Sequence, residues 1–271
     1  MASGGGDGPR FDGQVGIVTG AASGIGAATV GYLTRSGATV VAVDRDADGL
    51  EALWSNNSRV QTMTVDVSDS NAVTRVVNDA VSALGRLDFL AHAAGVDASR
   101  AIKVRVSEYY DQRARGNGEL GLSATADLSD DEWRRVVGVN LDGTFYCVRA
   151  ALTHMIPARK GNIVTVSSVG GIVGAAGYAH YSASKGGVRT FTQAVAREVE
   201  GFGIRVNCIA PGAIDTPMLA RTPRAVEDGK SPNKRVGHPD EVAAAIAFLL
   251  SDLGSFIVGE TLNVSAGMLI V

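Results

Sequence analysis

Residue types that often mark a metal site or a redox environment are scarce in this sequence. Its 271 residues include two cysteines, Cys147 and Cys208, and both lie in apolar stretches. A CxxC motif is absent, so we expect two buried, reduced thiols and no cysteine-based metal or redox motif. The four histidines form no cluster with ligand spacing. The sequence therefore predicts no metal site.

An excess of positive charge and long apolar runs are lacking as well. The net charge is −3 and the pI is about 5.8, which argues against nucleic acid as a partner. No stretch approaches the 18 or so uninterrupted apolar residues of a membrane span, so no membrane partner is expected. Residues 1–12 are rich in glycine and have no apolar core of a signal peptide. We expect a flexible leader on a cytoplasmic protein.

Hydrophobic residues make up 45% of the chain and recur in short runs between helical patterns. Near-continuous apolar runs separated by helices are typical of parallel strands that are buried on both faces. The pattern predicts an α/β fold with a doubly wound, mainly parallel, seven-stranded Rossmann-type sheet and helices on both faces. Residues 13–271 are expected to form one domain with an insertion at about 97–126. The expected strands are 14–19, 38–43, 59–65, 87–92, 162–166, 204–209 and 260–264.

The first strand leads directly into a glycine-rich turn, residues 19–26. Glycine lets the backbone approach a ligand closely, and the N-terminus of the following helix can hold a pyrophosphate. Asp44 ends the second strand, where its carboxylate can accept both hydroxyls of an adenosine ribose and would repel a 2′-phosphate. This favours NAD over NADP, although Arg45 would suit NADP. Asp66 and Val67 end the third strand and are placed to flank the adenine.

Tyr181 and Lys185 are four residues apart, which on a helix places them on the same face. A cation about 4–6 Å away favours the phenolate and lowers the tyrosine pKa from near 10. The pair can therefore act as a general acid or base. The pattern alone is common, and it gains weight here from the dinucleotide turn. Ser168 lies 13 residues before Tyr181, at the end of the predicted strand 162–166.

In combined order and spacing, these features resemble the short-chain dehydrogenase/reductase family. The resemblance covers nearly the whole chain, from about Gly13 to Gly267. It implies a Rossmann-type fold, a nicotinamide cofactor, and hydride transfer between an alcohol and a carbonyl. The elements that carry it are the turn 19–26, Asp66, Asn140, Ser168, the Tyr181–Lys185 pair and Pro211-Gly212.

The resemblance also implies a role for each matching residue. Tyr181 would be the general acid/base, Lys185 would lower its pKa and bind the nicotinamide ribose, and Ser168 would hold the substrate oxygen. Its neighbour Ser167 would have a supporting role. Asn140 would bend its helix and support a water chain from the lysine. Cofactor contacts are further implied at Gly20, Ser23, Gly24, Ile25, Gly26, Asp66, Val67, Ala94, Gly95, Tyr181, Lys185, Pro211, Gly212, Ile214 and Thr216.

Three features depart from the family pattern. His92 stands where the family usually has asparagine, and histidine is larger and titrates near neutral pH. The segment 97–126 is longer than usual and carries a local charge of +3 over residues 99–115. It is either a solvated surface insertion or a cap over the pocket that would suit an anionic substrate or the pyrophosphate. The segment after Met218 is short and polar, which suits a mobile lid or an open pocket.

The favoured function is an NAD-dependent enzyme that interconverts a secondary alcohol and a ketone. One alternative keeps the same site but uses NADPH for carbonyl reduction of the 3-oxoacyl type. Another is a non-catalytic NAD-binding protein, against which the intact set of Asn140, Ser168, Tyr181 and Lys185 argues. The expected partner is a small-molecule substrate whose identity stays open. The resemblance further implies a homodimer or homotetramer.

Overall fold

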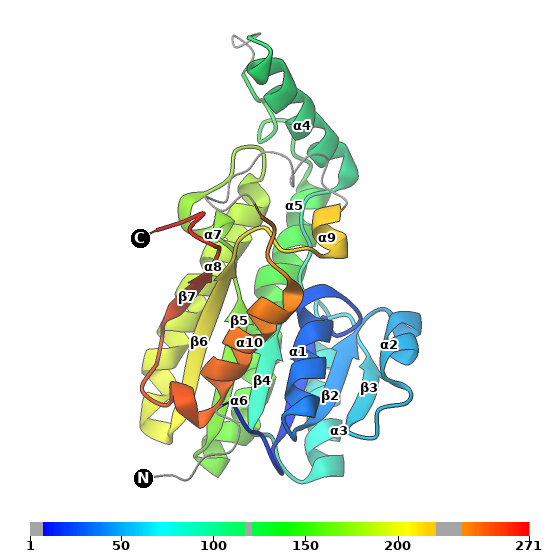
Figure 1. Ribbon diagram of the computed structural model, residues 1–271, viewed down its shortest axis with the longest axis vertical. Helices are drawn as coiled ribbons and strands as arrows, with labels where there is room; N and C mark the ends of the chain where they lie inside the picture. Colours follow the sequence, from blue (N-terminus) through cyan, green and yellow to red (C-terminus); the bar gives the residue numbers. More distant parts are fainter. Residues whose placement is uncertain (1–7, 117–120, 221–234, 271) are drawn as a thin grey trace.

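Seven parallel strands form a single sheet in the computed structural model, which describes residues 8–116, 121–220 and 235–270. The strand order is β3-β2-β1-β4-β5-β6-β7 (Figure 1). This order and the parallel pairing confirm the predicted Rossmann-type sheet. The strands are β1 (Val15–Thr19), β2 (Thr39–Asp44), β3 (Val60–Thr64), β4 (Phe89–His92), β5 (Gly161–Val166), β6 (Ile204–Pro211) and β7 (Thr261–Val264).

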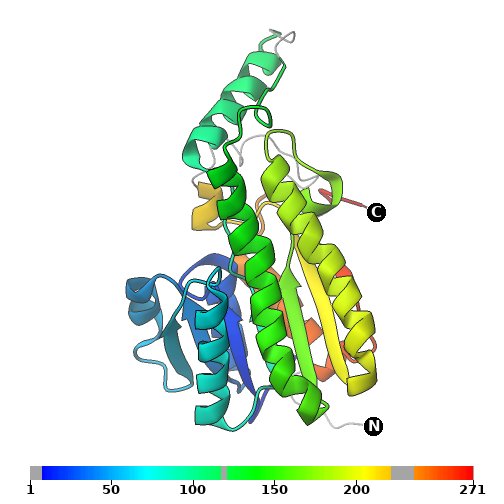
Figure 2. The ribbon, with the colours of Figure 1, turned by 180° about the vertical axis from the view of Figure 1, so that it is seen from behind.

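Helices cover both faces of the sheet, which explains why the central strands are apolar on both sides. In β1, Ile17 faces one core cluster and Val18 the other, because successive side chains of a strand point to opposite faces. The first cluster is completed by α3 (Ser70–Leu84), α6 (Gly143–Ala158) and α8 (Ala179–Val199), seen in front in Figure 2. The second is completed by α1 (Gly24–Arg35), α2 (Ala47–Trp54) and α10 (Pro239–Leu250) (Figure 1).

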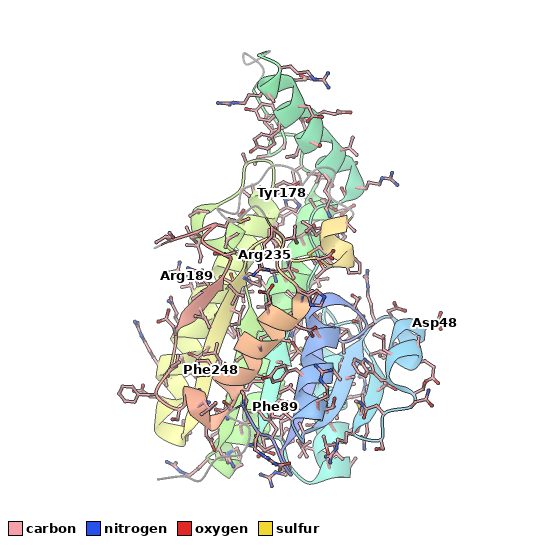
Figure 3. All side chains as sticks on the ribbon, in the orientation of Figure 1. Asp48, Phe89, Tyr178, Arg189, Arg235 and Phe248 are labelled. Atoms are coloured by element: carbon pink, nitrogen blue, oxygen red, sulfur yellow. The ribbon has the colours of Figure 1, made fainter. Side chains whose placement is uncertain are left out.

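One close approach in the core requires glycine. A Cβ at Gly16 in β1 would lie 1.9 Å from Cε2 of Phe89 in the neighbouring β4. The Phe89 ring fills this space and meets Phe11 edge-to-face, with ring centroids 5.5 Å apart. Figure 3 shows Phe89 in the part of the body opposite α4. Gly16 and Phe89 lie near the amino ends of β1 and β4. Their close packing therefore supports the two strands whose carboxyl ends carry the site.

A single wide turn joins two helices near the site. The helix α5 (Asp130–Val137) continues through a π-helical turn, η1 (Gly138–Asp142), directly into α6. Asn140 lies in this turn, where the family resemblance implied a bend. The remaining short elements are α7 (Gly170–Val173), η2 (Glu200–Phe202), α9 (Pro217–Ala220) and η3 (Asp252–Gly254).

The expected insertion contains a helix that the sequence analysis did not predict, α4 (Arg100–Ala114). It projects beyond the carboxyl ends of the strands, at the top of Figure 1. The expected lid after Met218 includes residues 221–234, which lie outside the described residues. Throughout the described part of the chain, no helix combines the length and apolarity needed to cross a membrane.

Candidate active site

A cleft of about 970 Å³ opens at the carboxyl ends of the strands, between the first strand-to-helix turn and α4. Ligands of open α/β sheets bind at this edge, so the cleft is the first candidate for a cofactor site. Most of the predicted cofactor residues meet here although they are far apart in sequence. Those that line the cleft are Gly20, Ser23, Gly24, Ile25, Gly26, Asp44, Asp66, Val67, Ala94, Gly95 and Thr216.

The glycine turn is built so that no side chain fills the space at the start of α1. Gly20 has φ +71°, and a Cβ there would lie 2.8 Å from the backbone nitrogen of Ala94. A Cβ at Gly26 would lie 2.0 Å from the carbonyl oxygen of Gly20. Within the described residues, the Ser23 side chain makes no capping hydrogen bond to α1. The first N–H groups of α1 can therefore bind an anion, and the turn fits a pyrophosphate.

Two carboxylates are held at the other side of the cleft. Asp44 accepts hydrogen bonds from the backbone nitrogens of Ala22 at 3.0 Å and Asp46 at 3.1 Å. These bonds fix its orientation toward the turn. Asp66 accepts from the backbone and the hydroxyl of Ser68, and these bonds hold the pKa of Asp66 below its usual range. The charged form of Asp66 is therefore favoured.

Five of the predicted cofactor residues do not line this cleft: Tyr181 and Lys185, which are described below, and three residues of the loop after β6. Pro211 ends β6, and Gly212 donates its backbone N–H to the carbonyl oxygen of Val264 in β7. The Ile214 side chain is buried in the core and lines a separate, smaller pocket. Only Thr216 of this loop reaches the cleft. A cofactor contact through the Ile214 backbone stays a prediction.

Ser168 and Tyr181 meet beside Gly170, although they come from the end of β5 and from α8. A Cβ at Gly170 would lie 3.5 Å from Oγ of Ser168 and 3.7 Å from Cε1 of Tyr181. Burial raises the pKa of Tyr181, a hydrogen bond with Ser168 lowers it, and the charge of Asp97 raises it, with a net increase. The direction is opposite to the one predicted from Lys185. Burial outweighs the favourable contacts that the chain itself supplies.

Lys185 is buried next to the cleft. Its Nζ donates a hydrogen bond to the carbonyl oxygen of Val166 at 2.8 Å. A Cβ at Gly95 would lie 3.1 Å from this Nζ, so the ammonium lies directly behind the cleft wall. Burial lowers the pKa of Lys185 to about 8. Ser167 supports this turn of α8 by donating its hydroxyl to the carbonyl oxygen of Lys185 at 2.7 Å.

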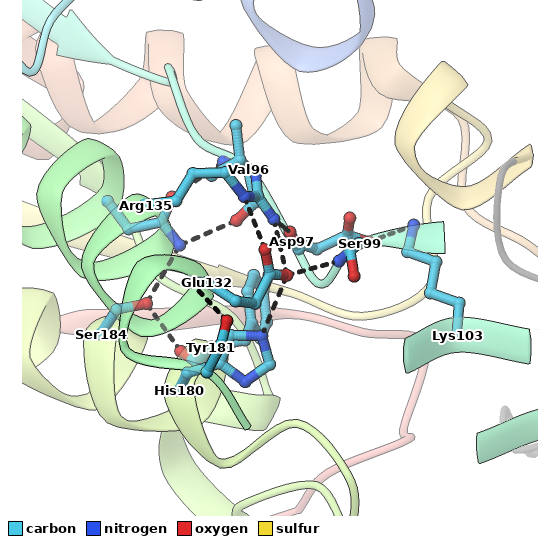
Figure 4. Close-up of polar contacts among 11 residues, drawn as sticks. Val96, Asp97, Ser99, Lys103, Glu132, Arg135, His180, Tyr181 and Ser184 are labelled. Carbon is cyan, nitrogen blue, oxygen red and sulfur yellow. Dashed lines mark hydrogen bonds and ion pairs between the residues drawn. The ribbon is translucent and has the colours of Figure 1, made fainter. Parts of the chain in front are cut away.

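Asn140 connects the cleft wall to the tyrosine. Its Nδ2 donates to the carbonyl oxygen of Val96 at 2.9 Å and to Oγ of Ser184 at 3.0 Å. Its Oδ1 accepts from the backbone nitrogen of Val96 at 2.8 Å, and Ser184 Oγ donates to the carbonyl oxygen of Tyr181 at 2.8 Å (Figure 4). The π-helical turn thus holds the segment after β4 against the catalytic turn of α8. The predicted water chain stays a prediction.

His92 connects β4 to β1 at the base of the cleft. Its Nδ1 lies 2.9 Å from Oγ1 of Thr19, and this hydroxyl also accepts from the backbone nitrogen of Ala94 at 3.1 Å. Burial, with a smaller contribution from the charge of Lys185, lowers the pKa of His92 to about 3. The expectation that His92 titrates near neutral pH is therefore wrong. Its desolvated ring stays uncharged and acts as a neutral hydrogen-bonding group.

The neutral ring of His92 predicts an acid-sensitive fold. An unfolded histidine takes up a proton near pH 6.5, whereas the folded ring resists it until about pH 3. Folding stability is therefore fully present above pH 6.5 and is lost as the pH falls toward 3. Between pH 6.5 and 4.5, the free energy of unfolding should fall by about 2–3 kcal/mol more in the wild type than in His92→Asn. Urea unfolding at both pH values measures this difference. His154→Asn is the control, and an equally steep loss in the His92 variant would contradict the prediction.

A polar network that sequence reasoning missed lies beside the tyrosine (Figure 4). His180 is buried, and its Nε2 lies 3.7 Å from Oε1 of Glu132. Glu132 also accepts from the backbone nitrogen of Ser99 at 2.6 Å and forms an ion pair with Arg135. Arg135 in turn donates to the carbonyl oxygen of Asp97 at 2.6 Å. Glu132 and Arg135 are three residues apart on α5, but their contacts with His180, Ser99 and Asp97 join separate segments that no sequence spacing brings together.

A parallel sheet with a glycine-lined cleft at its carboxyl ends and a tyrosine and a lysine on α8 define a Rossmann-type, dinucleotide-binding oxidoreductase. A family profile described as short chain dehydrogenase matches residues 14–227. The chain belongs to this family. Its members bind a nicotinamide cofactor and act on hydroxyl or carbonyl groups, and this protein is an oxidoreductase of that kind.

Curated relatives match the chain over nearly its full length. It is 40% identical to cis-4-hydroxycyclohexanecarboxylate dehydrogenase of Sinomonas cyclohexanicum, over 96% of this chain and 98% of that protein. It is 36% identical to a 3-oxoacyl-acyl-carrier-protein reductase of Thermotoga maritima, over 96% of this chain and all of that protein. Among solved structures, levodione reductase superposes with a TM-score of 0.82 at 31% identity, covering 95% of this chain and 98% of that one.

Proposed function

We propose that this protein oxidises a secondary alcohol to a ketone with NAD, and that the reverse reduction uses the same groups. The observation that carries this proposal is the meeting of Ser168 and Tyr181 at Gly170, with Lys185 buried behind the adjoining cleft wall. The cleft fits a dinucleotide, because its glycine turn leaves the N-terminus of α1 free for a pyrophosphate. A nicotinamide cofactor held in this cleft would supply the hydride acceptor for oxidation and the hydride donor for reduction.

The side chains divide the proton chemistry between them. Ser168 would hold and polarise the substrate oxygen by hydrogen bonding. Tyr181 would take the hydroxyl proton during oxidation and give it back during reduction, so that loss of a proton and a hydride converts C–OH to C=O. The Lys185 ammonium beside this site would stabilise the tyrosine phenolate electrostatically. Asn140 would keep the cleft wall and the tyrosine turn in register through Val96 and Ser184.

The choice of NAD rests on Asp44. Its carboxylate is fixed at the cleft by two backbone N–H groups, where it would bind ribose hydroxyls and repel a 2′-phosphate. Asp44→Ala should lower the ratio of kcat/KM for NAD over that for NADP by about tenfold or more, since each 1.4 kcal/mol corresponds to a factor of ten. Asp48→Ala, an exposed carboxylate of α2, is the matched control (Figure 3). An unchanged ratio in the Asp44 variant would exclude this role.

A second candidate function is NADPH-dependent reduction of a 3-oxoacyl group. The full-length similarity to a 3-oxoacyl-acyl-carrier-protein reductase supports it, as does Arg45, which lines the cleft beside Asp44. Steady-state comparison of NADH with NADPH, using a 3-oxoacyl thioester and a simple ketone, separates the two candidates. A strong preference for NADPH together with the thioester would favour the second.

The most direct test of the proposed function is an NAD-reduction screen over secondary alcohols grouped by size and charge. Alcohol-dependent formation of NADH, lost in Tyr181→Phe, is the expected result. Binding of NAD without alcohol-dependent turnover across the whole panel would contradict the proposal. It would instead support the non-catalytic NAD-binding alternative.

We also propose a homodimer or homotetramer in the cytoplasm. Phe145 on α6 is 40% exposed and contacts Phe191 on α8, so the two helices present an apolar group at the surface. These are the helices that the family resemblance pairs between subunits. Cys147 and Cys208 are both buried and free, which suits a reducing compartment. Size-exclusion chromatography with light scattering should give a mass of at least two chains.

A further inference from the structure

The helix α4 contacts the loops that surround the cleft. Lys103 in its first turn is only 2% exposed, and its Nζ lies 2.6 Å from Oδ2 of Asp97, which follows β4. The same Nζ donates to the carbonyl oxygen of Met218, after β6, at 3.1 Å. One turn further on, Val106 fills the space at Gly177, where a Cβ would lie 2.4 Å from Val106 Cγ2. α4 therefore joins the loops after β4, β5 and β6.

Asp97 lies at the catalytic end of the cleft. It follows Gly95 by two residues, a span of at most about 7 Å, and the Cβ position of Gly95 is 3.1 Å from Nζ of Lys185. Asp97 and Lys103 line the same cleft as Gly95. The charge of Asp97 also raises the pKa of Tyr181, so its carboxylate is near enough to act on the acid/base residue. Figure 4 shows this grouping, with Lys103 reaching across from α4.

The Asp97 carboxylate keeps hydrogen-bonding capacity toward the cleft. Its side chain is 22% exposed, and a carboxylate offers about four acceptor positions. Among residues 8–116, 121–220 and 235–270, this carboxylate is hydrogen-bonded to Lys103 and to its own backbone amide, and the charge of Arg135 also acts on it. The guanidinium of Arg135 makes its hydrogen bond to the backbone oxygen of Asp97. Acceptor positions thus remain for a ligand.

The ion pair determines which ligand group suits these positions. The Lys103 ammonium cancels the charge of Asp97, so the pair attracts neither a cationic amine nor an anionic group by net charge. A second carboxylate would meet the acceptor oxygens of Asp97 directly. A neutral hydroxyl can donate to the free acceptor positions, and half-buried acceptors gain from such a partner. The chemistry therefore favours an alcohol group.

We propose that Asp97 accepts a hydrogen bond from a second hydroxyl of the substrate, so that the preferred substrates are diols or polyols. Lys103 is a positioning residue, which holds the carboxylate and neutralises it. This inference rests on the proposed function, because the first hydroxyl must react at Tyr181. It gives α4 a role in substrate choice, since the helix carries Lys103 to the site.

The test compares substrates that differ only in the second hydroxyl. The probes are butane-2,3-diol against butan-2-ol and cyclohexane-1,2-diol against cyclohexanol, with kcat/KM measured under NAD saturation. The wild-type enzyme should favour the diols by about 10- to 100-fold, as expected for a hydrogen bond to a charged group. In Asp97→Leu/Lys103→Met, which removes both buried charges together, this preference should disappear. The values for the mono-alcohols should change much less.

If the double variant does not fold, Asp97→Asn replaces it in the test, because it preserves the side-chain volume. It should also reduce the preference for diols over mono-alcohols. Glu108→Gln, on the exposed face of α4, is the matched control and should keep it. Equal kcat/KM for diols and mono-alcohols in the wild type would overturn the inference and leave the proposed function standing. Preference for 3-hydroxybutyrate over the diols would overturn it too. Turnover of none of these alcohols would overturn the inference, whereas the proposed function is contradicted only if the wider alcohol screen also gives no turnover.

Discussion

Replacing Tyr181 by phenylalanine is expected to lower kcat by about 10²- to 10⁴-fold, the usual contribution of a positioned general acid or base. The phenol is the only group of the Ser168–Tyr181 pair that can carry the proton away, since an alcohol hydroxyl is far too weak an acid. NAD affinity should be nearly unchanged, because phenylalanine keeps the ring. Measuring kcat with the best alcohol of the screen, and NAD binding by fluorescence titration, checks both parts.

The matched control is Tyr178→Phe. Tyr178 immediately precedes α8 and is half-buried, and burial raises its pKa to about 12. It has no lysine four residues on, and we expect its variant to retain kcat within a few-fold. Comparable losses in the two variants would mean that the tyrosines act through packing. Substantial turnover in Tyr181→Phe with intact NAD binding would exclude the proposed acid/base.

Gly26→Ala is expected to cost about 1–3 kcal/mol of folding stability and to weaken NAD binding strongly, as overpacking does in a tight core. The added Cβ would lie 2.0 Å from the carbonyl oxygen of Gly20. Both positions belong to the cofactor turn, and a backbone oxygen cannot swing aside as a side chain can. The start of α1 must therefore shift away from the turn. Thermal unfolding and NAD titration give the two effects.

Gly31→Ala, in the same helix, is the control for this change. A Cβ at Gly31 meets Nη1 of Arg35 at 3.1 Å, the flexible end of an exposed side chain that can move. Alanine is about 1 kcal/mol better than glycine within a helix, so this variant should be at least as stable as the wild type. Its NAD affinity should be unchanged. A Gly26 variant that binds NAD as well as the Gly31 variant would show that the turn tolerates a side chain.

The sheet and most of the cleft were predictable from the sequence for a simple reason. Buried strands have an apolar signature, and residues that follow successive parallel strands must gather at one edge. Asp44 ends a strand and Asp66 and Gly95 each follow one, and the structure brings them to one cleft. Ile214 also follows a strand, but its side chain turns into the core, a choice that depends on the packing of α10.

The long-range polar contacts could not be predicted. In the sequence, Lys103 is one of several charges in an insertion that could be a solvated surface segment, and only the fold places Asp97 and Met218 around it. The protonation of His92 is likewise set by its surroundings, because the same ring in water would titrate near neutral pH. Burial and distance are properties of the tertiary structure, and neither has a local signal at these positions.

The π-helical turn between α5 and α6 sets the direction in which Asn140 faces relative to the core face of α6. A π turn accommodates one more residue than an α turn, so it shifts the angular phase between the two helices by about 100°. Asn140 can thus face Val96 while Val148 and Met155 of α6 face the core. Deletion of one residue within this turn would rotate Asn140 relative to the core face of α6 by about the same angle. The length of the chain at residues 138–142 therefore matters to this site together with the identity of the asparagine.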